Sequence, residues 1–227
     1  MSVLIFDADD TLWENNIYFE RAFDDFVEFL AHASLTPPQV REVLNEIELV
    51  NSKIHGYGSL NFGRNLQQAY QHLAEREILP DDLEHVMSLA ERILRQPVEL
   101  IEGVQETLAE LSLRHHLALF TKGHPEEQRL KVDRSGLGPY FFYTAIVKEK
   151  DSPAYLRLIE QNAFNAANSW MIGNSPKSDI NPALEAGLGA VLVPHARTWV
   201  LEHQELRTPA GARFLQVDRF ADLNRHF

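Results

Sequence analysis

The stretch VLIFDADDT, residues 3–11, decides how this sequence is organised, because an apolar run leads directly into three carboxylates and a hydroxyl. The apolar part has the composition of a buried strand. Asp7, Asp9 and Asp10 follow it, and anions this close repel one another unless a cation or a hydrogen-bond network holds them. A solvated turn would carry the same charges at little cost. The rest of the sequence decides between a polar turn and a charged site.

The overall composition limits the classes of partner. The 227 residues suffice for one large domain or for a core with a substantial insertion, and 44% hydrophobic residues are typical of a globular protein. A net charge of −12 argues against nucleic acid or an anionic membrane as the main partner. An anionic substrate stays possible, because a bound metal and a few lysines can reverse the local field.

The sequence contains no cysteine, which excludes disulfides, zinc–thiolate sites and thiol nucleophiles. It shows no secretory signal, and no apolar run approaches the ~20 residues that a membrane helix needs. We therefore expect a soluble, cytoplasmic protein.

Five short apolar runs recur along the chain: VLIF, HLALF, YTAIV, SWMIG and AVLVP. Helix-like stretches such as VQETLAELSL separate the later runs. This alternation predicts an α/β fold with a parallel sheet between layers of helices. Ligands of such sheets bind at the carboxyl ends of the strands. These ends carry Asp7, Thr121, Lys148 or Lys150, and Asn174.

The interval between the first two runs spans about a hundred residues, far more than one crossover helix needs. Its apolar residues keep the spacing of amphipathic helices, and Pro37 and Pro80 are placed to start two of them. We expect a helical subdomain over residues 14–98, and a core made of residues 1–13 and 99–227.

One stretch of this subdomain, HGYGSLNFG, reads as a loop between helices. It contains His55, Tyr57 and Asn61, which are side chains able to contact a substrate. A flexible turn without any functional role explains the same glycines equally well.

The pair of carboxylates after the first run suits phosphoryl transfer. Two carboxylates in different environments can take different roles, one ionised and the other protonated. The ionised one can attack phosphorus and form an aspartyl-phosphate, and the other can protonate the leaving oxygen and later activate water. The phosphate oxygens also need Mg²⁺ and a lysine to neutralise them.

Four stretches, in order along nearly the whole chain, resemble the motifs of the haloacid dehalogenase superfamily of phosphohydrolases. FDADDTL is similar to the first motif, so that Asp7 falls on the nucleophile, Asp9 on the acid/base and Thr11 on a hydroxyl position. LFTKG is similar to the second motif, with Thr121 on the phosphate-binding hydroxyl. In KEKDSPAY, Lys150 precedes a proline by three residues, as the third-motif lysine commonly does.

IGNSPKSDI is similar to the fourth, metal-binding motif, with Asp179 on its second acid. The motif usually begins Gly-Asp, whereas Asn174 follows Gly173 here. An amide oxygen can ligate Mg²⁺ but brings no charge, so we expect weaker metal binding. The resemblance implies a Rossmann-like three-layer core, and a mobile helical cap where this chain has its insertion.

The resemblance also favours one chemistry within the superfamily. The dehalogenase branch lacks an acid two residues after its nucleophile, and Asp9 stands at that position here. We therefore expect a Mg²⁺-dependent phosphatase that acts on a small phosphorylated metabolite, without nucleic acid or membrane partners. Its acid/base would be held protonated by less polar surroundings. Phosphate would be bound by Thr121, Lys150 and the backbone of Lys122, whose side chain is expected to be solvated, and the metal by Asp7, the Asp9 carbonyl and Asn174 or Asp179.

Several alternatives stay open. A phosphomutase would use the same acids, and a weakened protein that only binds phospho-ligands is motivated by Asn174. A phospho-acceptor module like the response-regulator receivers fits less well, since such modules are shorter and lack a helical insertion. Lys148 could replace Lys150 as the phosphate ligand, and Asp10 reads as a loop carboxylate that accepts backbone N–H bonds. The histidines show no metal spacing, and the segment beyond His195 receives no chemistry.

Overall fold

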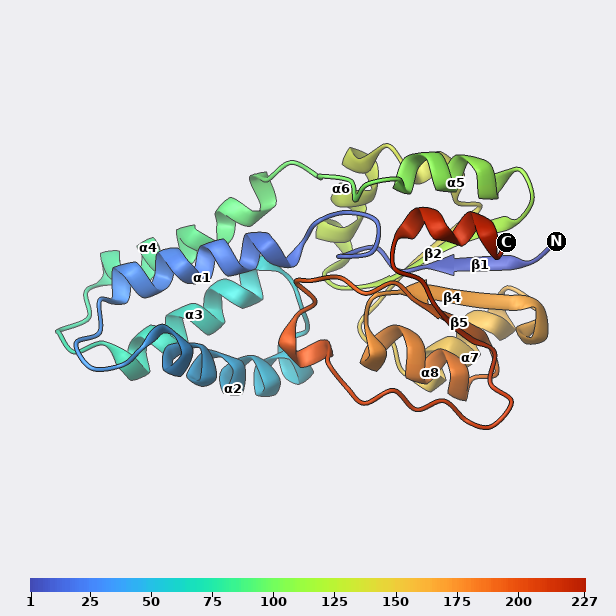
Figure 1. Ribbon diagram of the computed structural model, residues 1–227. Helices are drawn as coiled ribbons and strands as arrows, with labels where there is room; N and C mark the ends of the chain where they lie inside the picture. Colours follow the sequence, from blue (N-terminus) through green and yellow to red (C-terminus); the bar gives the residue numbers. More distant parts are fainter. The chain divides into compact units, whose positions relative to one another are not determined.

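The five apolar runs form five strands of a six-stranded sheet in the order β3-β2-β1-β4-β5-β6, shown in Figure 1. All neighbouring strands pair in parallel, so their carboxyl ends lie along one edge of the sheet. The central strand is β1, in which Leu4 lies opposite Leu117 on one side and Trp170 on the other. The strands are β1 (Val3–Phe6), β2 (His116–Lys122), β3 (Tyr143–Val147), β4 (Ser169–Gly173), β5 (Gly189–Leu192) and β6 (Phe214–Gln216).

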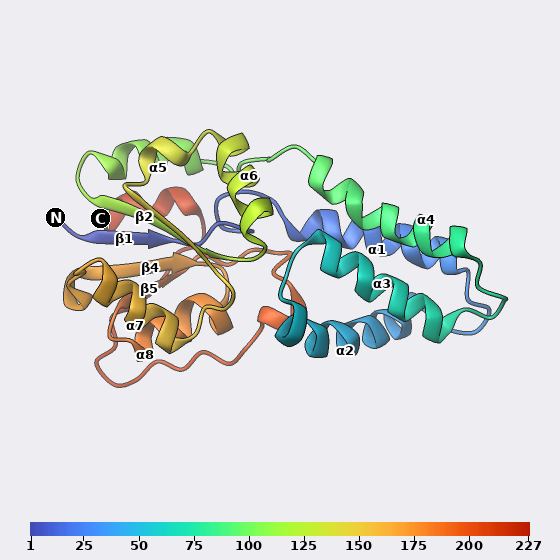
Figure 2. The same ribbon diagram turned by 180° about the vertical axis from the view of Figure 1, so that it is seen from behind.

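Helices cover both faces of this sheet, as Figures 1 and 2 show. One face carries α5 (Val104–Ser112), α6 (Pro125–Ser135) and the terminal 3₁₀ helix Phe220–Arg225, and the other carries α7 (Ser152–Gln161) and α8 (Asn181–Glu185). The predicted α/β fold with a parallel sheet is confirmed.

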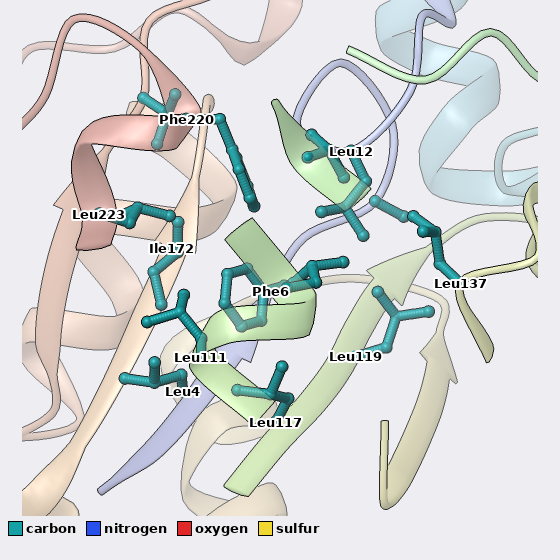
Figure 3. Close-up of a cluster of buried hydrophobic side chains, with 14 of the residues drawn as sticks. Leu4, Phe6, Leu12, Leu111, Leu117, Leu119, Leu137, Ile172, Phe220 and Leu223 are labelled. Atoms are coloured by element: carbon teal, nitrogen blue, oxygen red, sulfur yellow. The ribbon is translucent and has the colours of Figure 1, made fainter. Parts of the chain in front are cut away.

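The pleat of β1 divides its side chains between two cores, because successive residues of a strand point to opposite faces. Leu4 and Phe6 pack in the cluster on the α5 side, which Figure 3 shows, together with Leu111 and Phe220. Ile5 packs on the other side with side chains of α7 and α8. A strand buried on both faces has a nearly continuous apolar sequence, which is the pattern that begins this chain.

The structure describes residues 1–227 and divides into two units, Met1–Asn16 with Val98–Phe227, and Ile17–Pro97. The second unit has a hydrophobic core of its own, built around side chains such as Phe26, Leu44 and Leu66. None of the helices has both the length and the hydropathy needed to cross a bilayer. The helices of this part of the chain are α1 (Asn16–Leu30), α2 (Pro37–His55), α3 (Ser59–Leu73), α4 (Pro80–Glu91) and the short 3₁₀ helix Arg92–Arg95.

The two segments that leave and re-enter the first unit are paired with each other. Trp13 forms an antiparallel bridge with Leu100, the Glu14 N–H donates to the Glu99 carbonyl at 2.9 Å, and the Ile101 N–H donates to the Leu12 carbonyl at 3.0 Å. The indole of Trp13 is buried. The segment that carries the acidic loop is therefore fixed at both of its ends, by β1 and by this bridge.

Candidate active site

A buried ion triplet lies at the carboxyl edge of the sheet. The Lys150 ammonium, from the loop before α7, donates to Asp7 Oδ1 and to Asp179 Oδ1, each at 2.5 Å. It also donates to the Phe120 carbonyl at 3.1 Å, which ties it to β2. All three charged side chains are nearly inaccessible to water. Three strand ends far apart in sequence thus meet around one ammonium group.

The triplet contains two carboxylates and one ammonium group, and this excess of negative charge affects the pKa of Asp7. Burial and then the nearby charge of Asp179 raise the pKa of Asp7, Lys150 opposes both, and the resulting pKa is about 7 in place of 3.8. Burial alone would lower the pKa of Lys150, but the two carboxylates raise it above its ordinary value. Lys150 is therefore a permanent cation, whereas the charge of Asp7 depends on what else binds beside it.

The second oxygen of Asp7 and the amide oxygen of Asn174 both contact the Thr11 hydroxyl. The Thr11 hydroxyl lies 3.1 Å from Asp7 Oδ2 and 3.2 Å from Asn174 Oδ1, so both oxygens face one point. Asn174 Nδ2 donates to Thr198 Oγ1 at 3.0 Å, and this hydroxyl in turn donates to the His195 carbonyl at 3.0 Å. Because Thr198 uses its own proton on His195, it accepts from Asn174 and so turns the amide oxygen toward the Thr11 hydroxyl.

Asp179 is presented by an unusual turn, a π-helical segment that spans Pro176–Ile180. In this turn the N–H groups of both Asp179 and Ile180 donate to the Ser175 carbonyl. The Ser175 N–H donates to Asp179 Oδ2 at 2.9 Å, so both carboxylate oxygens of Asp179 are bonded. Such turns insert one extra residue into a helix and recur at functional sites. Ser178 and Asp179, which both lie in this turn, are buried.

The structure distinguishes among the lysines that the sequence proposed. Lys150 is buried against Asp7, whereas Lys148 is exposed. Thr121 is buried at the end of β2, as predicted for a strand-end hydroxyl. The Lys122 side chain, expected to be solvated, instead donates to Glu202 Oε1 at 2.6 Å and to Ser178 Oγ at 2.9 Å. That expectation is wrong because the segment after β5 brings a carboxylate to Lys122.

Asp9 has a more polar environment than the sequence analysis expected. The Lys131 ammonium donates to its two oxygens at 2.9 and 3.0 Å, Gln128 Nε2 donates at 2.8 Å, and the Trp13 indole N–H donates at 2.8 Å. Lys131 also donates to Asn15 Oδ1 at 2.7 Å. The expectation of apolar surroundings for Asp9 is therefore wrong, because α6 directs two polar side chains at this carboxylate.

Asp10 behaves as predicted for a loop carboxylate. It has φ = 58°, and its side chain accepts from the backbone N–H groups of Asn15 and Asn16 at 2.9 and 3.0 Å, where α1 begins. Its oxygens lie with those of Glu14 and a ring nitrogen of His195 within 4.8 Å of one another. His195 Nδ1, however, accepts from the backbone N–H of Arg197, and Asp10 is already bonded, so we assign this group to holding two loops together.

The loop between α2 and α3, in the glycine-rich stretch of the second unit, is shorter than expected. Helix α2 continues to His55 and α3 begins at Ser59, so Asn61 lies inside a helix. Its amide donates to the carbonyls of His55 at 2.7 Å and of Gly56 at 3.3 Å. Placing Asn61 in a loop was wrong, because its side chain closes the turn in which Tyr57 lies. The substrate contacts suggested for these residues stay a prediction.

Four residues that the sequence analysis did not single out contact the site. Gln128 and Lys131 bind Asp9, Glu202 binds Lys122, and the buried Tyr155 hydroxyl donates to the Ser178 carbonyl at 2.9 Å. Gln128 and Lys131 lie three residues apart on α6, a spacing that places both on one helix face. That spacing is the one signal in the sequence that could have indicated a pair acting together.

Comparison with known proteins agrees with this arrangement. The family model for haloacid dehalogenase-like hydrolases matches residues 1–187. No curated protein matches the chain. The chain is similar over its full length to a haloacid dehalogenase-like family hydrolase from Xanthomonas campestris, with 26% identity, a TM-score of 0.85 and 94% of that chain covered. The resemblance stated from the sequence motifs is thus confirmed.

Two further solved structures share the fold. YfnB from Bacillus subtilis, named as a HAD-hydrolase bound to magnesium, is 17% identical with a TM-score of 0.69, and the match covers 99% of this chain and 97% of that one. A predicted phosphoglycolate phosphatase from Haemophilus somnus 129pt is 15% identical with a TM-score of 0.68, and the match covers 100% and 97%. Dehalogenases and a protein assigned as a beta-phosphoglucomutase also match, so shared fold leaves the reaction open.

Proposed function

Since this chain belongs to the haloacid dehalogenase-like hydrolase family, we propose that it is a Mg²⁺-dependent phosphatase acting on a small phosphorylated metabolite. The observation that carries the proposal is the placement of Asp7, whose oxygens contact the Lys150 ammonium and the Thr11 hydroxyl at the carboxyl edge of the sheet. A second carboxylate, Asp9, follows two residues later in the same loop. This pair supplies a nucleophile and a proton carrier within one short segment.

The residues of the site fit a divalent cation. Asp7 Oδ2 and Asn174 Oδ1 face the same hydroxyl, and oxygens of this kind are the ligands that Mg²⁺ prefers. The buried carboxylates outnumber the single ammonium, and a cation would offset that excess. Asp7, Asn174 and the Asp9 carbonyl would hold the ion, and Asp179, whose two oxygens are bonded to Lys150 and Ser175, would add negative charge nearby. When bound, Mg²⁺ would neutralise phosphate oxygens and favour the ionised form of Asp7.

In the proposed first step an oxygen of Asp7 attacks phosphorus, in line with the bond to the leaving oxygen. The new bond between Asp7 and phosphorus makes an aspartyl-phosphate intermediate, and the bond between phosphorus and the leaving oxygen breaks. The leaving oxygen takes its proton from Asp9, which acts as general acid. In the second step Asp9 takes a proton from water, whose oxygen attacks phosphorus, so that phosphate leaves and Asp7 is regenerated.

Asp9 must exchange partners during this cycle. In the structure its two oxygens accept hydrogen bonds from Lys131, Gln128 and Trp13. To carry a proton in the first step, Asp9 has to give up at least one donor as substrate enters. The arriving leaving group offers an oxygen in place of that donor.

The phosphoryl oxygens would be bound by Thr121, Lys150 and the backbone of Lys122. Lys150 lies closest to Asp7 among the lysines, and it is buried, so its interaction with an anion is weakly screened. The side chain of Lys122 is bonded to Glu202, which supports a role for its backbone N–H alone. The cytoplasmic location and the absence of nucleic-acid and membrane partners stay predictions from the sequence.

The proposal is tested by measuring phosphate release from p-nitrophenyl phosphate, with Mg²⁺ and with EDTA, for wild type, Asp7→Asn and Asp9→Asn. We expect turnover by wild type with Mg²⁺ only, and loss of turnover in both variants. Chloride release from 2-chloropropionate is measured in parallel, and activity there instead of on the phosphate ester would overturn the proposal. Activity that requires an added sugar bisphosphate would instead identify a phosphomutase.

A further inference from the structure

A buried carboxylate outside the proposed catalytic residues lies at the centre of the loops that carry them. Glu202 ends a short 3₁₀ turn, Val200–Glu202, in the connection between β5 and β6. It is 7% exposed, although glutamate is rarely buried without partners. Nothing in the proposed reaction uses this residue, so its burial needs a different explanation.

Both oxygens of Glu202 are bonded to residues of other loops. Oε1 accepts from the Lys122 ammonium at 2.6 Å, and Oε2 accepts from the hydroxyls of Ser175 and Ser178 at 2.6 and 2.5 Å. Lys122 also contacts Glu149 at 3.3 Å. The carboxylate therefore connects the loops that follow β2, β3 and β4 with its own loop after β5.

The two serines connect Glu202 to the acid that binds Lys150. The Ser178 N–H donates to Ser175 Oγ at 2.9 Å, and the Ser175 N–H donates to Asp179 Oδ2 at 2.9 Å. Each serine hydroxyl thus has one fixed role as donor to Glu202. A displacement of Ser175 would move Asp179, and with it the ammonium that contacts Asp7.

The surroundings of Glu202 favour the ionised form of its carboxyl group. Burial would raise its pKa, but Lys122 and the serine hydroxyls outweigh that effect and lower it below its ordinary value. The surrounding turn is also held without this side chain, because Lys177 Nζ donates to the Leu201 carbonyl at 2.9 Å. A change at Glu202 should therefore alter the position of the serines more than the path of its own loop.

We propose that Glu202 is a positioning residue for the cation site, which acts through Ser175 and Ser178 to hold the turn that presents Asp179. The inference rests on the proposed function, because it assumes that a cation binds beside Asp7. The Glu202 side chain bonds to Lys122, Ser175 and Ser178, and to none of the residues proposed to hold the cation. Loss of residues that orient metal ligands typically weakens metal binding by about 10–100-fold, and we expect about tenfold for Glu202→Gln.

The test uses binding, and activity is not needed. The thermal unfolding midpoint of the metal-free protein is measured at increasing MgCl₂ and constant ionic strength, which gives an apparent Kd. The variants are Glu202→Gln, Ser175→Ala, the double variant, and Glu205→Gln. Glu205 is an exposed glutamate of the same segment, so it controls for the loss of a nearby negative charge.

We expect the apparent Kd to rise about tenfold in Glu202→Gln, to change less than twofold in Glu205→Gln, and to be no weaker in the double variant than in Glu202→Gln alone. Equal Kd values for wild type and Glu202→Gln would overturn the inference while leaving the proposed function intact. Losses that multiply in the double variant would also overturn it, because two residues on one path do not act independently. A wild-type midpoint that does not respond to Mg²⁺ would instead remove the proposed function.

Should Glu202→Gln fail to fold, Ser175→Ala still tests the path. It keeps the Glu202 carboxylate and the ion pair with Lys122 and removes only one hydroxyl. A Kd that rises several-fold supports positioning through Ser175. An unchanged Kd means that any effect of Glu202 is one of charge alone, and the inference falls.

Discussion

Replacing Asp7 by asparagine should make the metal-free protein more stable relative to wild type as the pH rises, although the same change removes the proposed nucleophile. The carboxylate is 6% exposed and shares one ammonium with Asp179. Burial, followed by the charge of Asp179, raises its pKa from 3.8 to about 7. Without a bound cation, the ionised Asp7 carboxylate is thus expected to destabilise the folded protein.

The sign follows from proton linkage. The folded chain holds the Asp7 proton more tightly than the unfolded chain does, because the pKa of Asp7 is raised on folding. This contribution to stability is fully present below pH 3.8 and is lost as the pH rises through about 7. A pKa unit corresponds to about 1.4 kcal/mol, so wild type should lose roughly 2–3 kcal/mol through this group between pH 5 and pH 8. Asparagine does not titrate and escapes the loss.

The measurement is the thermal unfolding midpoint in EDTA at pH 5 and pH 8 for wild type and Asp7→Asn. For a chain of this size, 1 kcal/mol shifts the midpoint by about 2–4 °C, so the difference between the two proteins should change by roughly 5–10 °C in favour of the variant. Any constant cost of the substitution cancels in this comparison. Asp10, whose pKa burial raises to about 6, destabilises both proteins with the same sign and cancels as well.

The control is Asp133→Asn, which makes the same chemical change at an exposed carboxylate, and its midpoint should follow that of wild type at both pH values. Added Mg²⁺ at pH 8 should raise the wild-type midpoint and leave that of Asp7→Asn almost unchanged, since the variant lacks the anion that holds the ion. A difference that stays constant from pH 5 to pH 8, or that changes in the opposite direction, would refute the reasoning about burial and shared charge.

Three further changes test neighbouring parts of the site. Lys150→Met leaves Asp7 and Asp179 buried without their cation, so it should abolish activity and lower the free energy of unfolding at pH 8 by about 3–5 kcal/mol, measured by urea denaturation. Asn174→Asp adds an anion beside Asp7 and should lower the Mg²⁺ concentration for half-maximal activity about tenfold, while the metal-free midpoint falls. Gly173→Ala would place a methyl group 2.3 Å from Asp179 Oδ2. It should therefore raise the apparent Kd for Mg²⁺, measured from unfolding midpoints at increasing MgCl₂, whereas an unchanged Kd would show that the turn adjusts freely.

The parts of the fold and site that the sequence predicted depend on short-range pattern and on one topological rule. Runs such as VLIF are apolar on both faces, which favours a strand buried between helix layers. Parallel pairing then brings the strand ends together, which is why Asp7, Lys148 or Lys150, and Asn174 could be grouped although 143 positions separate Asp7 from Lys150. The resemblance to the fourth motif added Asp179 to this group. The starts of α2 and α4 were predictable because Pro37 and Pro80 each occupy a first helical turn.

The parts that were not predicted depend on side-chain direction. The polar environment of Asp9 comes from Gln128 and Lys131 of α6, and the absence of a side chain at Gly123, in the turn after β2, leaves room for Gln128. Glu202 lies in an irregular connection without any periodic pattern that could place it on a face. The sequence shows that these residues are polar, but only the packed structure shows that Gln128 and Glu202 are buried at the site.

Asn174 is understood only from the sequence and the direction of its side chain together. From the sequence it is a departure that removes one anion from the fourth motif. In the structure its amide is turned by Thr198 so that the oxygen faces the Thr11 hydroxyl that also contacts Asp7, which keeps a ligand atom while omitting the charge. An aspartate here would add a third carboxylate around one ammonium, in a place where Asp7 already has a pKa of about 7. Asparagine therefore lowers the electrostatic cost of the metal-free fold, and weaker cation binding is the expected consequence of that exchange.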